Sequence, residues 1–140
     1  MRITRFAGAP SYAPPLHTGV DCKRLQGHEA GPTQQFWVGH SVYQPGAQAS
    51  ASPTLEETVY TVLSGEVVVV ASGREETLRA LDSVHLPRGT LRSVENRSAQ
   101  PASILVTIAM PSNLRSRAEE PRASTPAAAL AASENERPTP

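Results

Sequence analysis

Two histidines and a tyrosine occur on stretches that alternate in the manner of β-strands. His40 shares a face with apolar neighbours, whereas His85 falls on a different face from Val84 and Leu86. Because histidine titrates near neutral pH, His85 and His40 are candidate acid and base if both point into one interior. Tyr60, if it also points inward, would orient a ligand or donate a proton. The competing interpretation is that these side chains are hydrogen-bonded structural groups, surface groups or packing.

A substitute metal site is a further interpretation of the two histidines. It would join His40 and His85 to Glu57, but it requires three strands to converge and follows no known ligand spacing. The adjacent Glu56 does not complete a catalytic pair with Glu57, since neighbouring strand residues point to opposite faces and one of the two is expected in solvent. The sequence has no glycine-rich phosphate loop, no paired CxxC elements and no GxSxG motif.

The stretches that position these side chains have strand-like composition and are bounded by turn signals. Pro45-Gly46 is interpreted as a turn, Ser72-Gly73 as a hairpin and Pro87-Arg88-Gly89 as a type I turn. His17 and His28 fall in predicted loops, and we assign them no role. Short strands at turn spacings of roughly 8–12 residues predict an all-β sandwich or barrel. The predicted strands are residues 2–6, 20–25, 35–43, 57–63, 67–71, 75–79, 83–86, 91–95 and 102–110.

Composition and charge exclude several classes of protein. The 140 residues suffice for one domain with a core, and equal totals of 13 basic and 13 acidic residues provide no basic field for nucleic acid or an anionic membrane. No apolar run approaches the roughly 20 residues of a membrane helix, and the N-terminus lacks the apolar centre of a secretory signal. The single cysteine, Cys22, excludes an internal disulfide, so we expect a cytoplasmic protein.

Three parts are expected along the chain: an N-terminal arm at residues 1–19, a β domain at residues 20–110 and a tail at residues 111–140. The tail is rich in Ala, Pro, Ser, Glu and Arg and has almost no large apolar side chains. Because it cannot bury enough apolar surface to offset its ordering entropy, we predict that the tail is disordered.

Two blocks of the sequence resemble the conserved blocks of the cupin family, which are small jelly-roll β-barrels. They are residues 45–66, PGAQASASPTLEETVYTVLSGE, and residues 81–96, LDSVHLPRGTLRSVEN. The resemblance covers roughly residues 20–110 and implies a cupin-like jelly-roll barrel. The residues that match the family's turn and scaffold positions are Gly46, Gly65, Asp82, Pro87, Gly89 and Asn96.

The same resemblance implies that the metal ligands of the family are missing. The ligand positions fall on three neutral hydroxyls, which are poor ligands, and on Arg92, a permanent cation without a lone pair. We therefore expect no metal and no cofactor, but a pocket whose central cation suits a carboxylate, phosphate or enolate. The alternative is a decayed site in which Arg92 pairs with Glu57 or Glu95. The residues expected to bind a ligand are Arg92, Thr58, Thr54, Ser52 and Glu57.

These expectations leave three functions open, because a fold alone does not decide function. We favour a metal-independent protein that binds a small organic molecule, anionic or carbonyl-containing, in the barrel. The alternative is a metal-independent isomerase, cyclase or lyase that uses His85, His40, Tyr60 and Arg92 for acid–base chemistry. A metal-dependent oxygenase with rearranged ligands is disfavoured. The resemblance also implies a homodimer, to which residues 2–6 would contribute by adding to a neighbouring sheet edge.

Overall fold

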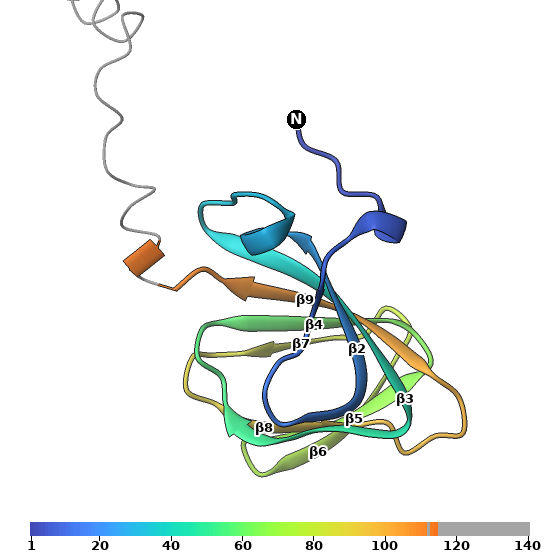
Figure 1. Ribbon diagram of the computed structural model, residues 1–140. Helices are drawn as coiled ribbons and strands as arrows, with labels where there is room; N and C mark the ends of the chain where they lie inside the picture. Colours follow the sequence, from blue (N-terminus) through green and yellow to red (C-terminus); the bar gives the residue numbers. More distant parts are fainter. Residues whose placement is uncertain (112, 115–140) are drawn as a thin grey trace, which may run out of the picture.

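Strands form most of the part of the chain that the structure, a computed structural model, describes, namely residues 1–111 and 113–114 (Figure 1). They make one nine-stranded antiparallel sheet that curls into a nearly closed barrel, so the predicted all-β jelly-roll barrel is confirmed. The predicted disorder of residues 111–140 falls almost wholly outside the described residues. The strands are β1 (Ser11–Tyr12), β2 (His17–Gln26), β3 (Phe36–Pro53), β4 (Thr58–Ser64), β5 (Glu66–Ala71), β6 (Arg74–Arg79), β7 (Ser83–Leu86), β8 (Leu91–Glu95) and β9 (Ala102–Ala109).

The order of strands across the sheet is β6-β5-β8-β3-β9-β4-β7, with β2 added alongside β3 and β1 alongside β2. Figure 1 shows β4 and β7 on one side of the barrel and β8, β5 and β6 on the other. Strand β3 joins the two sides, because it pairs with β9 in its first half and with β8 in its second.

The chain continues through Pro45 and Gly46 as one strand, so the turn predicted there is wrong. Gly46 has a φ of +81°, which bends the strand without ending it, and its N–H donates to the Asn96 carbonyl at 2.9 Å. Proline has no N–H to pair, and it is tolerated here because β3 exchanges its partner strand at this bend. The bend carries residues after 47 across the barrel, where they face β8.

The interior is filled by the alternate side chains of both halves of the barrel. Asn96 is a buried polar side chain: its amide donates to the carbonyls of Tyr43 and Gln100 at 2.8 and 2.7 Å. It thereby ties the end of β8 to the bend of β3, as expected of a scaffold position. The apolar core consists of Tyr43, Ala47, Ala49, Tyr60, Val62, Val67, Val69, Leu86, Val94, Ala102, Ile104 and Val106.

The N-terminal arm packs on its own barrel. Residues 2–6 do not form the predicted strand; instead Arg2 Nε donates to the Ala30 carbonyl at 2.9 Å, and the Phe6 ring lies edge-on to His40 at 5.0 Å between centroids. A homodimer stays a prediction, although the strand expected to support it is absent. No helix in residues 1–111 and 113–114 is long and apolar enough to cross a membrane.

Candidate functional site

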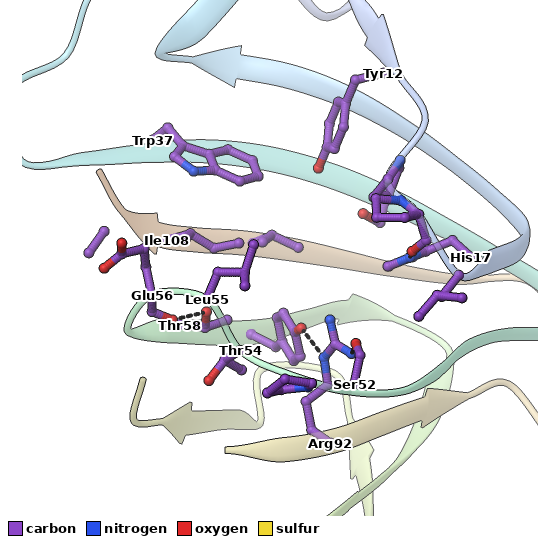
Figure 2. Close-up of a pocket in the computed structure, with 18 of the residues that line it drawn as sticks. Tyr12, His17, Trp37, Ser52, Thr54, Leu55, Glu56, Thr58, Arg92 and Ile108 are labelled. Carbon is purple, nitrogen blue, oxygen red and sulfur yellow. Dashed lines mark hydrogen bonds between the residues drawn. The ribbon is translucent and has the colours of Figure 1, made fainter. Parts of the chain in front are cut away.

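A cavity of about 600 Å³ opens inside the barrel, within the size range of small-molecule sites (Figure 2). Figure 2 shows Arg92 and Ser52 on one wall, with Trp37 and Tyr12 across from them. The walls come from all of the strands except β5, β6 and β7, while the chain between β1 and β2 contributes residues at the opening. The cavity therefore depends on the N-terminal arm as well as on the barrel.

Arg92 lies at the centre of the polar wall. Its Nε donates to the Tyr60 hydroxyl at 3.0 Å, and its Nη1 donates to Ser52 Oγ at 2.7 Å and to the Ser50 carbonyl at 3.5 Å. A guanidinium has five N–H donors, so the two on Nη2 lie beyond these bonds and can reach a ligand. The pairing of β3 with β8, which sets Ser52 opposite Arg92, fixes this arrangement.

The alternative interpretation, in which Arg92 pairs with Glu57 or Glu95, is wrong. Glu57 Oε2 bonds His85 at 2.8 Å, and Glu95 Oε2 accepts from Arg97 at 2.7 Å. The ion pairs among residues 1–111 and 113–114 include none with Arg92. A half-buried guanidinium with hydroxyl and carbonyl partners retains its full positive charge toward the cavity.

The threonines expected near Arg92 do line the cavity, but their hydroxyls are partly used by the fold. Thr54 Oγ1 donates to the Pro87 carbonyl at 2.7 Å and accepts from the Thr90 N–H at 3.0 Å, so it fastens the β7–β8 turn to β3. Thr58 Oγ1 donates to the Glu56 carbonyl at 2.9 Å. Both hydroxyls can still accept a hydrogen bond, but neither has a proton left for a ligand.

Two histidines of the described residues line the cavity, His28 beside Trp37 and His17 at the start of β2. The Nδ1 of His17 lies 2.8 Å from the Pro15 carbonyl, and because a carbonyl only accepts, Nδ1 must carry the proton. The neutral ring then has its lone pair on Nε2, which takes up the second proton when the ring is charged. Burial lowers the pKa of His17, as does the positive charge of Arg92, while the Pro15 carbonyl opposes them.

Aromatic rings form the wall opposite Arg92. Trp37 lies edge-on to Tyr12, with ring centroids 5.8 Å apart, and edge-on to His28 at 5.5 Å. The Arg24 guanidinium lies over the Tyr12 ring at 3.8 Å and over the Trp37 ring at 4.3 Å. Burial raises the pKa of Tyr12, so this phenol stays protonated at neutral pH. Aromatic rings together with a protonated phenol suit a ligand that has both apolar faces and hydroxyl groups.

Among the described residues that line the cavity, Glu56 is the one with a carboxyl side chain, and Figure 2 shows it on the side away from His17. It is half-buried, whereas the adjacent Glu57 points out of the barrel with 65% of its side chain exposed. The prediction that only one of the two can face the interior is confirmed, and the interior residue is Glu56. The placement of Glu57 among the ligand-binding residues is therefore wrong.

The inward orientation expected of His85 and His40 is also wrong. His85 pairs across β4–β7 with Val59 and shares its outer face, with 55% of its side chain exposed. Leu86, its neighbour, is buried, because the apolar face of β7 is the interior face. His40 lies on the outer face of β3, where Nε2 is 2.5 Å from Ser103 Oγ.

The substitute metal site does not form, since no group of three His, Cys, Asp or Glu side chains suited to a metal occurs in the described part of the chain. Tyr60 does face the cavity, and it is buried as expected. Sequence reasoning missed His17 and Tyr12, which lie in the arm, and His28 and Glu56, which lie outside the strands. The signal that could have found the first two is the Pro14-Pro15 pair, which stiffens a segment between two strands.

Comparison with known proteins places this geometry in a family. Residues 39–108 match the family model of the cupin domain. A relative, Beta-D-galactosidase Rv1717 of Mycobacterium tuberculosis, is 55% identical over 111 residues, which are 79% of this chain and 96% of the relative. The family resemblance that rested on the two sequence blocks is confirmed.

Solved structures share the barrel. The polyketide cyclase RemF from Streptomyces resistomycificus has a TM-score of 0.69 at 16% identity and covers 86% of this chain and 94% of its own. A sugar phosphate isomerase of the cupin superfamily from Silicibacter pomeroyi has a TM-score of 0.56 at 27% identity and covers 66% of this chain and 60% of its own. The likeness to the cyclase shows the fold alone.

Proposed function

We propose that this chain, which belongs to the cupin family, is a glycoside hydrolase that acts on a β-D-galactoside held in the barrel cavity. The observation that carries the proposal is the 55% identity to a relative named as a β-D-galactosidase, over 96% of that relative's length. The shared fold by itself would not support it, because the cupin barrel serves many chemistries.

The polar and aromatic walls supply what a pyranose needs. Arg92 Nη2 offers N–H donors to ring hydroxyls, while the Tyr60 and Ser52 hydroxyls, both held by Arg92, offer further polar groups. Trp37, on the opposite wall, offers an apolar face to the C–H groups of the sugar. A cavity of about 600 Å³ has room for a sugar and the first part of its leaving group.

Glu56 and His17 are the acid–base groups of the proposed reaction. Most glycosidases use two carboxyl groups, but here the described residues that line the cavity include one carboxyl, Glu56, and two imidazoles, of which His28 packs edge-on against Trp37. We assign the Glu56 carboxylate as the base and the protonated His17 as the acid. They lie on opposite sides of the cavity, and we therefore assign an inverting reaction, in which water attacks from the side of the base.

The hydrolytic step is then a single displacement. A water oxygen attacks C1 of the galactose while Glu56 takes one water proton, the bond from C1 to the glycosidic oxygen breaks, and His17 Nε2–H protonates the leaving oxygen. The products are α-D-galactose and the free alcohol. The Pro15 carbonyl holds His17 Nδ1–H throughout, so Nε2 is the atom that exchanges the proton.

Proton NMR of the purified protein with 4-nitrophenyl β-D-galactoside tests this proposal. We expect release of nitrophenol with α-D-galactose as the first anomer seen, and no hydrolysis of the α-galactoside. A first anomer of β configuration would refute the inverting assignment, and the absence of hydrolysis would refute the function.

The second candidate is the binding protein for a small organic acid that the sequence favoured. The observation that favours it is Arg92, whose hydrogen bonds within the described chain go to hydroxyls and a carbonyl rather than to a carboxylate. Thermal-shift measurements with galacturonate and galactose distinguish the two candidates. Under the second, galacturonate raises the melting temperature through Arg92 while the galactosides neither bind nor react.

A further inference from the structure

The cavity combines buried polar side chains in its depth with exposed aliphatic side chains at its opening. Several of its polar side chains lie deep, among them Tyr60 and Thr58, which are 6% and 3% exposed. Two large aliphatic side chains stand at the opening, since Leu16 is 59% exposed and Leu55 is 81% exposed, whereas Val106 is a buried part of the wall. A ligand that fits this gradient has a polar end inside and an apolar end at the mouth.

Leu16, at this opening, has an unfavourable backbone conformation. Its φ is +61°, a conformation that glycine adopts readily and that side-chain-bearing residues avoid. The Leu16 carbonyl accepts from the Ser50 N–H at 2.9 Å, which fixes the residue beside the second half of β3. Strain of this kind concentrates at functional sites, and here the exposed side chain that it displays gains little burial from the chain itself.

The rim consists of Pro14, Pro15, Leu16 and Leu55, all of which line the cavity. Pro14 and Pro15 limit the backbone freedom of the arm, so the rim is held in place before a ligand arrives. Leu55 comes from the chain between β3 and β4, so the rim has apolar side chains from two separate segments. The rim is continuous with the polar interior, because the same cavity includes Arg92 and Tyr60.

We propose that this rim binds the apolar leaving group of the galactoside, so that the substrates are alkyl, aryl or lipid-linked β-galactosides rather than oligosaccharides. This inference rests on the proposed function for the orientation of the sugar. With the hydroxyl-rich ring held by Arg92, the leaving group must extend toward the opening, where His17 follows directly after Leu16. An oligosaccharide leaving group would place hydroxyls against prolines and leucines, which offer them no hydrogen-bonding side chains.

A chain-length series of ligands tests the inference. Methyl, butyl, hexyl and octyl β-D-galactosides, each below its critical micelle concentration, are titrated while the fluorescence of Trp37 is followed. Trp37 is the single tryptophan of the chain and lines the cavity, so its signal reports binding without requiring turnover. The same series is assayed for hydrolysis. We expect the dissociation constant to fall about 2- to 4-fold per methylene until the chain extends past the rim.

The variants Leu16→Gly and Leu55→Ser identify the rim as the cause. Leu16→Gly removes the side chain at a position whose backbone glycine accepts, and the matched control is Leu81→Gly, since Leu81 is also exposed, has a φ of +72° and lies away from the cavity. We expect each rim variant to raise the dissociation constant of the octyl galactoside at least 5-fold while leaving that of the methyl galactoside unchanged. Leu81→Gly should retain the dependence of the dissociation constant on chain length.

Several outcomes would overturn the inference. Equal affinity for methyl and octyl galactosides would do so, as would a chain-length dependence that survives in both rim variants. Flotation with phosphatidylcholine vesicles that is lost in Leu55→Ser, without any effect of chain length, would make the rim a lipid-docking surface. A sedimentation coefficient that the rim variants lower, again with no chain-length effect, would make it a contact between copies. Chain-length-dependent binding without hydrolysis would instead sink the proposed function and leave the rim inference standing.

Discussion

The inner and outer faces of this barrel each carry a pair made of a glutamate and a histidine, but only the pair on the outer face forms a hydrogen bond between the two side chains. On the outer face, Glu57 and His85 bond each other at 2.8 Å, and more than half of each side chain is exposed. On the inner face, Glu56 and His17 lie on opposite sides of a cavity (Figure 2). The two groups of the outer pair bond each other, and an exposed pair of this kind contributes little to the free energy of unfolding. The inner pair is held apart, so a molecule can fit between the two groups.

The largest expected effect distinguishes two adjacent glutamates. Glu56→Gln removes the proposed base and should lower kcat for an aryl β-D-galactoside by about 10²–10⁴-fold. Glu57→Gln, one residue away on the outer face, should change kcat less than 2-fold. Both are measured by release of nitrophenol, with circular dichroism to show that the variants fold. Equal losses in the two variants would remove the distinction between the faces.

The histidines provide the second contrast. His17→Gln removes the proposed acid and should lower kcat by about 10²-fold, with a smaller loss for a nitrophenyl leaving group than for an alkyl one because nitrophenolate needs less protonation. His85→Gln, which breaks the exposed pair with Glu57, should leave both substrates unaffected. A loss in His17→Gln that is the same for both leaving groups would argue against its role as the acid.

The pH dependence follows from the environment of His17. Its pKa is lowered from 6.5 chiefly by burial and further by the charge of Arg92. Since the acid must be protonated, activity should rise as the pH falls toward that lowered pKa, and the optimum should lie on the acid side of 6.5. Arg92→Gln removes one of the lowering causes and should raise the pKa of His17, as followed by NMR of its ring. An unchanged or lower pKa in the variant would contradict this electrostatic account.

A smaller effect separates two hydroxyls that the sequence grouped together. Thr54→Val removes the hydrogen bonds of Thr54 Oγ1 to the Pro87 carbonyl and from the Thr90 N–H, so these two groups keep only their bonds within the turn. The loss of two hydrogen bonds across the strands should lower the free energy of unfolding by about 1–3 kcal/mol. Ser52→Ala should change it by less than about 1 kcal/mol, because Arg92 there is only half-buried and water can replace the lost acceptor. Urea denaturation of both variants checks the order, and a costlier Ser52→Ala would reverse the assignment.

The smallest expected effect concerns metals. The family's ligand positions fall on side chains that are poor ligands, and the hydroxyls of Ser52 and Thr54 already hold Arg92 and the β7–β8 turn. We expect elemental analysis to find no stoichiometric transition metal, and EDTA to leave the melting temperature unchanged. One bound equivalent whose removal lowers that temperature would return attention to histidine and glutamate ligands.

Periodicity and turn signals predicted much of this fold. Strand β4 has Thr58, Tyr60 and Val62 buried on one face, as its alternation indicates, and Asn96 ties strands together as the family position implies. The predicted turn at Gly46 failed because a glycine with positive φ can bend a strand as well as end it. Local sequence signals do not distinguish a strand that ends from one that bends, because the outcome depends on whether a partner strand is available to pair with the residues after the bend.

The site was harder to predict for a related reason. Alternation correctly put His85 and Leu86 on different faces, but the cavity lies on the apolar face, so the polar residue points outward. His17 enters the site because the arm crosses the opening and β2 then pairs along β3. That long-range contact leaves no periodic pattern in the sequence. Arg92 and Ser52, by contrast, were placed in the cavity because they match positions whose side chains point inward in the family.

The central claim is that the inner face, and not the outer one, holds a β-D-galactoside between Glu56 and His17. A crystal structure of Glu56→Gln with an intact octyl β-D-galactoside tests it most directly. We expect the pyranose ring between Arg92 and Trp37, the glycosidic oxygen within hydrogen-bond distance of His17 Nε2, and the octyl chain between Leu16 and Leu55. A sugar bound outside the barrel beside His85 and Glu57, or one whose glycosidic oxygen faces away from His17, would contradict the account.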